Sequence, residues 1–495
     1  MDDLSDGDKL ILRAFALKIR KHLTDDTFDK LPFVFKSDPL PSWDEARSRI
    51  SFLSGLNPIL YDCCPNSCCC FVGPHASAEK CPYCDTPRRG SDGRTRKSFV
   101  YIPLIPRLTA LFKNPDLSTK MKYRSEHVHT PEMISDIFDG SIYRNLLDKR
   151  VVVDGQQLSH TYFSDPRDIA LGLSTDGFAP FHHRKSTAWP LIAFNYNLPP
   201  ELRFHNEYTL CLGVIPGPEK PKDVDSFLWP AIEELLRLAV GVRAYDVLHS
   251  VLFVLHAYLI IVSGDIPAIS MLLNVKGHNG FSPCRACRIT GVATPAIRAK
   301  TYYVPLDRRR HPDVKFSTSI KMYDAHNLPL RTHSEMMAQA REVQLAPTQA
   351  DANRLSKLYR IKGISILSYL SSLSYPSSFP YDFMHLVWEN TIPNLVSHWT
   401  GDFKGLDQGG ESYHLEKSIW DAIGEATSAS GDTIPSVFAA RPPNLAGDRS
   451  SCTADSWSFW TLYLAPILLR GKFSKKKILR SFRGISEASS HLPSI

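Results

Sequence analysis

Apolar side chains fall at two spacings along this chain, one typical of helices and the other typical of buried strands. Apolar residues at every third or fourth position predict helices over 8–23, 43–56, 225–240, 266–274 and 382–400. Continuous apolar runs bounded by Gly, Pro or an acid predict strands over 151–153, 168–176, 188–198, 208–218 and 252–265. The chain is therefore expected to fold as an α/β protein.

The elements between residues 168 and 274 follow the order three strands, one helix, one strand, one helix. This is the order of a ribonuclease-H-like core, a mixed five-stranded sheet with helices packed on it. In such a sheet the first and fourth strands are neighbours, so the acids that end them, Asp176 and Asp265, are expected to converge. Two close carboxylates suit Mg²⁺ or Mn²⁺, because these hard cations prefer oxygen ligands.

The segment around Asp176 also has a simpler interpretation. Gly177 follows Asp176 at once, and an Asp-Gly pair is typical of a turn that the aspartate side chain caps. On local sequence alone the turn is the better prediction. The second apolar run that ends at Asp265 is what favours a metal site.

Composition places the chain among ordinary globular proteins. Its 495 residues, 43% hydrophobic and 22% charged, are enough for two to four domains. The net charge of +7 permits nucleic-acid binding without requiring it. The opening residues lack a secretory signal, and the most apolar window, 247–263, is shorter than the roughly 20 residues that cross a bilayer. We expect an intracellular protein without a membrane segment.

Seven of the 11 cysteines lie between residues 63 and 84. Two closely spaced pairs stand out within this cluster, Cys64 with Cys68 and Cys81 with Cys84. Four thiolates at this spacing can close a tetrahedral shell around Zn²⁺. Three neighbouring thiols leave the choice of ligands open: Cys63, Cys69 and Cys70. The sequence therefore predicts a zinc-binding module here.

A set of short motifs follows in a fixed order from residue 61 to residue 473. In chain order they are Tyr61-Asp62-Cys63-Cys64, Cys81-Pro82-Tyr83-Cys84, Asp165-Pro166-Arg167-Asp168, Ser174-Thr175-Asp176-Gly177, Gly264-Asp265-Ile266-Pro267, Cys284-Arg285-Ala286-Cys287, Tyr381-Asp382-Phe383-Met384-His385 and Trp457-Ser458-Phe459-Trp460. The ordered set resembles fungal transposases of the CACTA (En/Spm-like) superfamily, including the Plavaka-type elements of mushroom-forming fungi.

The resemblance implies a DDE-type transposase core, which cuts the ends of a DNA element and joins them to target DNA. Asp176 and Asp265 would be the first two of its three metal-binding acids, holding Mg²⁺ or Mn²⁺. A pair of such ions can activate a water or a 3′-hydroxyl and stabilise the leaving oxygen.

The third acid is expected on a helix. Along the predicted helix 382–400, Asp382, His385 and Glu389 share one face. Glu389 is favoured, and Asp382 is the alternative, although a helix cap alone would explain an Asp at that position. Asp455 is a further alternative.

Cys284 and Cys287 resemble the Cys-x-x-Cys signature that many eukaryotic transposases carry after the second acid. They are a candidate half of a second zinc site, which His278 and either His311 or His385 would complete. A turn with two packed thiols is an equally good interpretation, because a lone Cys-x-x-Cys supplies two of four ligands.

The patterns divide the chain into seven expected parts. These are a helical segment (1–60), a Cys-rich zinc module (61–100), a helical connector (101–160), the core with the first two acids (161–300), a helical insertion (301–375), the third-acid helix with the rest of the core (376–473), and a basic, Ser-rich tail (474–495) that is expected to be truncated.

The expected function is that of a nuclear DNA transposase, or a fragment of one, acting on double-stranded DNA as a homo-oligomer. The alternative is a catalytically inactive, domesticated protein that binds DNA and depends on zinc. A more remote alternative is a ribonuclease-H-like nuclease that cuts without strand transfer.

Overall fold

The computed structural model describes residues 4–34, 40–180, 186–277, 280–293, 302–309, 311, 314, 320–403, 409–435 and 440–490. The chain divides into two compact units, each built from several stretches. Unit 1 comprises 1–173, 177–259 and 369–372, and unit 2 comprises 174–176, 260–368 and 373–495.

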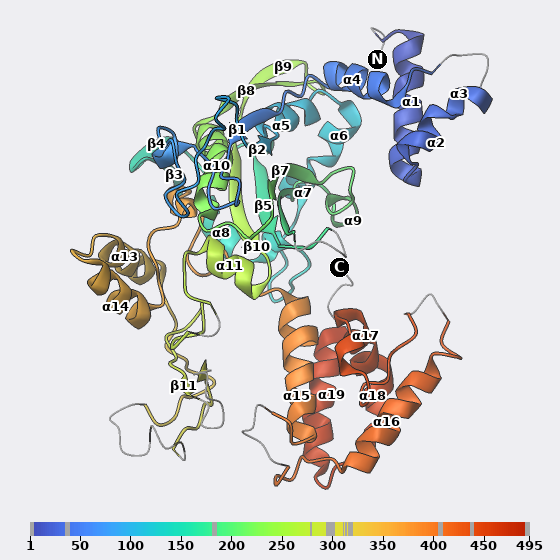
Figure 1. Ribbon diagram of the computed structural model, residues 1–495, viewed down its shortest axis with the longest axis vertical. Helices are drawn as coiled ribbons and strands as arrows, with labels where there is room; N and C mark the ends of the chain where they lie inside the picture. The colour runs from blue at the N-terminus through green and yellow to red at the C-terminus, as the bar shows by residue number, and fades with distance from the viewer. Residues whose placement is uncertain are drawn as a thin grey trace. The chain divides into compact units, whose positions relative to one another are not determined.

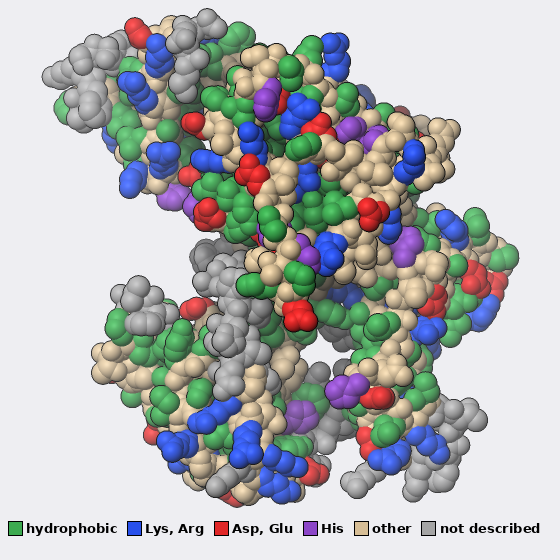
Figure 2. All heavy atoms as spheres, turned by 180° about the vertical axis from the view of Figure 1, so that it is seen from behind, with side chains coloured by type: hydrophobic (Ala, Val, Ile, Leu, Met, Phe, Trp, Pro, Cys, Tyr) green, Lys and Arg blue, Asp and Glu red, His purple; other side chains and the backbone are tan. Residues whose placement is uncertain are grey.

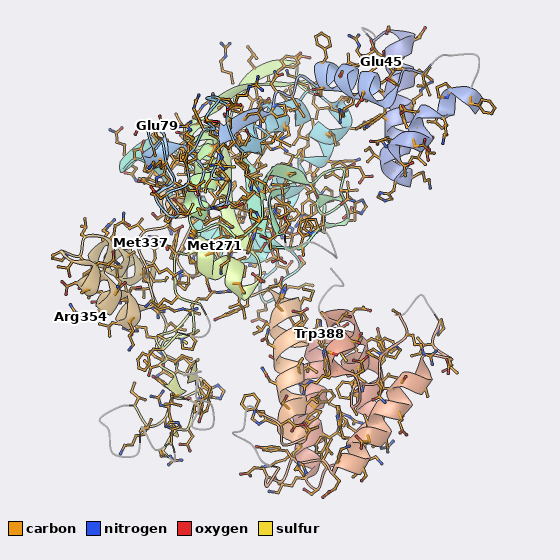
Figure 3. All side chains as sticks on the ribbon, in the orientation of Figure 1. Glu45, Glu79, Met271, Met337, Arg354 and Trp388 are labelled. Atoms are coloured by element: carbon orange, nitrogen blue, oxygen red, sulfur yellow. The ribbon has the colours of Figure 1, made fainter. Side chains whose placement is uncertain are left out.

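Unit 1 begins with a small group of helices. They are α1 (Asp6–Lys21), α2 (Asp25–Asp29), α3 (Leu31–Val34) and α4 (Trp43–Ser54). Phe28 is fully buried among them and meets the Trp43 ring edge-on, with 5.2 Å between the ring centroids. Glu45 accepts a hydrogen bond from the Ser42 backbone N–H at the start of α4, a capping box (Figure 3). The helices predicted over 8–23 and 43–56 are therefore confirmed.

A six-stranded sheet follows. In spatial order its strands are β1 (Ile59–Asp62), β2 (Ser98–Tyr101), β7 (Leu210–Pro216), β6 (Ala188–Asn195), β5 (Ile169–Thr175) and β10 (Ala257–Ser263). The pairs β1–β2, β2–β7 and β6–β7 are antiparallel. The mixed α/β class is confirmed, and β5 and β10 are neighbours as expected. The sheet has six strands where five were predicted: β5, β6, β7 and β10 are the first four core strands, the short strands β1 and β2 extend one edge, and no fifth core strand lies beside β10 among the described residues.

Two hairpins lie apart from the sheet. In the first, β3 (Arg150–Val153) pairs with β4 (Gln156–Thr161) across Asp154 and Gly155, whose φ angles of 50° and 76° suit a tight turn. In the second, β8 (Val242–Asp246) pairs with β9 (Val251–Leu255). The strand predicted over 252–265 is therefore two strands, β9 and β10, separated by His256.

Helix α10 (Val224–Val240) packs against one face of the sheet (Figure 1). Its residues Leu228 and Leu235 line a small apolar space together with sheet residues such as Leu171. The Glu234 carboxylate on this helix is buried. It accepts hydrogen bonds from the Tyr101 hydroxyl and from the backbone N–H groups of Leu104 and Ile105. α10 is thus joined to β2 by a polar contact within an apolar layer.

The other helical segments of unit 1 are short. They are η1 (Gly73–His75), α5 (Ile105–Leu111), α6 (Pro115–Lys120), α7 (Tyr123–Glu126), η2 (Ile137–Asp139), α8 (Ser141–Leu147) and α9 (Pro200–Arg203). The part predicted as a helical connector is therefore helical only in pieces.

Unit 2 contains the remaining elements. They are α11 (Ile266–Leu272), β11 (Val292–Ala293), β12 (Tyr302–Tyr303), α13 (His333–Gln344), α14 (Gln349–Tyr359), η3 (Ile366–Tyr369), η4 (Met384–Thr391), α15 (Ile392–Trp399), α16 (Lys417–Ser430), η5 (Arg449–Ser451), α17 (Ala454–Phe459), η6 (Trp460–Leu464), α18 (Ala465–Leu468) and α19 (Lys476–Ser490). Helix α13 packs against α14, and β11 pairs with β12.

The last helices of unit 2 enclose a tryptophan-rich core. Trp388 (Figure 3) packs there with Trp399, Trp457 and Trp460, all buried. The helix predicted over 382–400 is present as the π-helical turns of η4 followed by α15. Among the helices that the structure describes, none combines the length and apolar character needed to cross a membrane.

Replacing Glu234 with alanine is expected to destabilise unit 1 by about 2–4 kcal/mol, because buried donors lose their acceptor. Urea unfolding followed by tryptophan fluorescence measures this loss. Glu233 on the same helix is exposed and bonded to Trp229, so Glu233→Ala is the matched control and should change stability little. Equal losses of stability in the two variants would show that the buried hydrogen bonds of Glu234 do not account for the effect.

Candidate functional site

The cysteine-rich module is an excursion between the paired strands β1 and β2. The chain turns back on itself at each cysteine pair. In the first turn the Cys64 carbonyl accepts from the Ser67 N–H, and in the second the Cys81 carbonyl accepts from the Asp85 N–H. Ser67 and Asp85 adopt left-handed φ angles of 63° and 56°. These tight turns direct the thiols of each pair to the same side.

The four predicted thiols come together. The sulfur atoms of Cys64, Cys68, Cys81 and Cys84 all lie within 4.8 Å of one another, and all except that of Cys84 are buried. This set can hold a metal ion such as zinc. Of the thiols left open by the sequence, Cys69 lies 3.8 Å from the Cys81 sulfur, and Cys70 faces the Asp62 carbonyl.

The protonation of these thiols is set by burial and by hydrogen bonds. Burial raises the pKa of Cys68, so that its thiolate is unfavourable without a cation. Burial also acts to raise the pKa of Cys84, but hydrogen bonds from Thr86 and Asn66 outweigh it and lower the pKa to about 6. Cys84 is thus the candidate zinc ligand whose thiol ionises most readily. A bound cation would favour ionisation of the other three candidate ligands.

The module is anchored to the N-terminus of α10. Asp223 caps this helix through Oδ1, which accepts from the Ser226 N–H at 3.2 Å. Its other oxygen, Oδ2, lies 2.8 Å from His75 Nε2 and accepts from the Tyr83 hydroxyl at 3.1 Å. The carbonyl of the ligand Cys68 accepts from the Asp223 N–H. One aspartate therefore joins the main helix to both turns of the module.

Lys97 forms a second anchor of the module. Its Nζ donates to the Pro65 carbonyl and the Ser67 hydroxyl in the module, and to the Pro216 carbonyl at the end of β7. Sequence reasoning did not identify Lys97 or Asp223, because both act across more than 100 residues of chain. The helix-start pattern at Asp223 was the one local signal available.

The acids predicted to bind Mg²⁺ belong to unit 2. Asp176 follows β5 directly and is exposed. Asp265 follows β10 after one glycine and caps α11, with Oδ1 accepting from the Ala268 N–H at 2.6 Å. Each acid therefore stands at the end of one of two neighbouring strands.

A close backbone contact joins the two strand ends. A β-carbon added at Gly264 would lie 2.7 Å from the Thr175 carbonyl oxygen, closer than side chains tolerate. Gly264 precedes Asp265, and Thr175 precedes Asp176, so the contact brings the two acid-bearing turns together. A glycine is required at position 264 for this approach.

Two of the three candidate third acids, Asp382 and Glu389, lie close to His385. Asp382 Oδ1 accepts from the His385 N–H at 2.8 Å and lies 2.9 Å from His385 Nδ1. Glu389 Oε2 lies 3.8 Å from Nε2 of the same ring. Asp382 thus acts as a cap, the simpler role that the sequence left open for it, while the Glu389 side chain is 45% exposed.

The electrostatics of His385 connect this helix with the second acid. Partial burial lowers the pKa of His385, but the hydrogen bond to Asp382 and its charge raise it. The charges of Glu389 and Asp265 act in the same direction, and the net shift is upward. Asp265 is therefore near enough to His385 for its charge to be felt at the imidazole.

Asp455 lies in the first turn of α17, which packs against η4. Across the described ranges, the four cysteines are the one group of three or more Cys, His, Asp or Glu residues with all ligand atoms within 4.8 Å. Any three of the acids are therefore more widely spread than ligands around a single ion, and Mg²⁺ at Asp176, Asp265 and Glu389 stays a prediction.

Cys284 and Cys287 face each other and Tyr381. The Cys287 N–H donates to Cys284 Sγ at 3.3 Å, and the Tyr381 hydroxyl lies 3.3 Å from the same sulfur. The side-chain hydrogen bond with Cys287 is the main reason that the pKa of Cys284 falls to about 5.

The described residues do not complete a second zinc site around this pair. His311 Nε2 lies 2.9 Å from the Ala293 carbonyl, and His385 faces Asp382. His278 lies outside the described residues. The second zinc site therefore stays a prediction.

Comparison with known proteins adds one finding. Residues 148–342 match the sequence model of transposase family tnp2. The matched segment includes Asp176, Asp265 and the Cys284–Cys287 pair, and it excludes the zinc-binding cysteines and the candidate third acids. The match supports a transposase family for this chain. A search of curated proteins found no match.

Replacing Cys81 with serine is expected to abolish metal binding, because one of four thiolate ligands is lost. Elemental analysis of the purified protein should find about one zinc ion per wild-type chain and nearly none in the variant. The melting temperature should fall by more than about 5 °C, since 1 kcal/mol shifts a domain of this size by about 2–4 °C.

Cys70→Ser is the matched control for this change, because Cys70 is buried in the same module but lies outside the set of four sulfurs. It should keep its zinc. Zinc retained in Cys81→Ser and lost in Cys70→Ser would overturn the ligand assignment.

Proposed function

We propose that this protein is a DDE-type DNA transposase of the CACTA (En/Spm-like, Plavaka-type) group, with a ribonuclease-H-like core. The observation that carries the proposal is the position of Asp176 and Asp265 at the ends of neighbouring strands, within the segment that matches a transposase family. Its reaction is metal-dependent cleavage at the ends of a DNA element, followed by strand transfer.

The strand order supports the proposed core. The first four strands of the predicted core are, in chain order, β5, β6, β7 and β10. Side by side in the sheet they lie in the order β7, β6, β5, β10, that is, third, second, first and fourth. The pairing of β6 with β7 is antiparallel, as a meander of the first three strands requires. Strand four beside strand one is the arrangement that brings the first two acids to one edge.

The acids have the chemistry that such a reaction needs. Asp176, Asp265 and Glu389 would hold Mg²⁺ or Mn²⁺, which supplies an activated water or 3′-hydroxyl and stabilises the leaving oxygen. The cap on α11 engages Oδ1 of Asp265, so that the side chain is held in place at the end of the strand. His385 lies among Asp382, Glu389 and the charge of Asp265, and we assign it to orienting the third acid.

Exposed basic residues favour a nucleic-acid partner. The segment that follows α18 and enters α19 exposes Lys472, Lys475, Lys477 and Arg480. Figure 2 shows Lys and Arg side chains gathered at one end of the C-terminal helical part. Such a run suits the phosphate backbone of double-stranded DNA. Nuclear localisation and assembly into a homo-oligomer belong to the same proposal.

Asp265→Asn tests the proposal most directly. Asparagine caps a helix as well as aspartate does, so α11 should keep its start while the metal loses a charged ligand. Cleavage of a duplex carrying the element ends, in Mg²⁺, should fall by more than roughly a hundredfold, the upper loss for groups that merely support metal ligands. A matched control is Asp324→Asn, at an exposed turn of unit 2, which should cut normally.

The same assay separates the competing functions. Wild-type protein that binds the duplex without cutting it in Mg²⁺ or Mn²⁺ would favour the inactive, domesticated alternative. Cut ends that are never joined to a target would favour a nuclease. Cleavage that persists in Asp265→Asn at the wild-type rate would eliminate the proposed metal site.

The third acid is identified by three parallel variants. Glu389→Gln is expected to abolish cleavage, while Asp382→Asn keeps its cap on His385 and should retain part of the activity, and Asp455→Asn should retain all of it. Rates measured in Mg²⁺ and again in Mn²⁺ provide the comparison. Full activity in Glu389→Gln with loss in either of the other two would move the assignment to that residue.

A further inference from the structure

Unit 1 contains a cavity of about 310 Å³ that the proposed chemistry does not use. It is lined by side chains of α7, η2, α8 and the segment that leads to β5. Its polar lining residues are Arg124, Ser125, His127, His129, Tyr143, Arg144 and Ser164. Two arginines, two histidines and three hydroxyl-bearing side chains thus line one space, and no acidic side chain is part of the lining.

Arg124 brings a buried positive charge to this cavity. The residue is 5% exposed, and its guanidinium donates to the carbonyls of Asp165, Pro166 and Asp168 and to the Tyr143 hydroxyl. All these acceptors are neutral. Within the described part of the chain, none of the ion pairs includes Arg124. A buried cation without a counter-ion is costly, and an anion in the cavity would reduce that cost.

The two histidines are held in fixed orientations by a carboxylate behind them. Asp139 Oδ1 lies 2.8 Å from His127 Nε2 and 2.9 Å from His129 Nδ1. Its other oxygen accepts from the Ser135 hydroxyl and from two backbone N–H groups. The hydrogen bond from His127 is the largest reason that the pKa of this carboxyl lies well below its usual range.

Each imidazole keeps its second nitrogen for another partner, Nδ1 on His127 and Nε2 on His129. The three side chains do not surround a cation, because His127, His129 and Asp139 are absent from the metal-binding groups of the described residues. The carboxylate is already saturated by hydrogen bonds. The charge that remains for a ligand is therefore positive.

Arg144 adds an exposed guanidinium on α8. Guanidinium, imidazole and hydroxyl donors around one space match the several acceptor oxygens of a phosphate group. We propose that this cavity is a phosphate-binding site in unit 1, separate from the acids of unit 2. The phosphate belongs either to a DNA backbone, which rests on the proposed function, or to a small molecule.

Arg144→Gln tests the site in the full-length protein, since an exposed side chain can be changed without disturbing the fold. Inorganic phosphate and a fluorescently labelled DNA duplex serve as separate probes, both without Mg²⁺ and at fixed ionic strength. Affinity for phosphate, measured by calorimetry, should fall about tenfold, the loss expected for one charge-assisted contact. Arg144→Lys should recover part of it.

Lys149→Gln is the matched control, because it removes the same charge from an exposed position just after α8 and outside the cavity lining. If Arg144→Gln weakens both probes and Lys149→Gln weakens neither, the ligand is a DNA phosphate. If Arg144→Gln weakens inorganic phosphate alone, the ligand is a small phosphate. Equal effects of the two variants, or none with either probe, would overturn the site.

This test is separable from that of the proposed function. Asp265→Asn protein should bind phosphate like the wild type, because the cavity lies in unit 1 and the acid in unit 2. Phosphate should also shift the NMR resonances of the imidazole protons of His127 and His129. This phosphate-dependent change should be absent in the His129→Gln variant. Loss of cleavage in Asp265→Asn with unchanged phosphate binding would support both assignments independently.

Discussion

The candidate catalytic centre depends on how closely the ends of β5 and β10 approach each other. At Gly264 a β-carbon would stand 2.7 Å from the Thr175 carbonyl, so any larger residue would push the strand ends apart. The same glycine lets the chain pass from a buried strand into the cap of α11 within two residues. The backbone geometry at Gly264 therefore sets the position of Asp265. Its side chain is held by the hydrogen bond with which it caps α11. Asp176 directly follows Thr175, whose carbonyl makes the close contact at Gly264, so it leaves β5 beside the same turn.

Much of this fold could be predicted from sequence because the relevant signals are local. Helices α1, α4 and α10 begin at Ser or Asp caps and carry apolar stripes, and their observed ends differ from the predicted ones by a few residues. Strands β1 and β2 were missed because each is four residues long with three consecutive apolar residues, fewer than in the runs that predicted β5, β6, β7 and β10. The break at His256 was missed because β9 and β10 are both apolar, and the interruption comes from the hydrogen bond between His256 and Asp168, 88 residues earlier.

The candidate sites also differ in how far local sequence could predict them. The four candidate zinc ligands lie within 21 residues, so their spacing indicated the set that the structure brings together, although Cys63, Cys69 and Cys70 left the choice open. The acids come from three distant stretches, and local sequence could place only the two that end strands. Whether Asp382 or Glu389 is the third metal-binding acid depends on which of the two carboxylates already accepts a hydrogen bond from the helix start. The cap on His385 engages Asp382, and this contact depends on where the helix starts, which patterns predict least reliably.

The metal sites therefore have separate physical roles. The thiols lie in a module held by Asp223 at the start of α10 and by Lys97 at the end of β7, so a zinc ion bound there would contribute to the stability of the sheet edge in unit 1. Zinc loss should act first on folding and only through folding on chemistry, whereas a change at Asp265 that preserves its cap acts on chemistry with the fold intact.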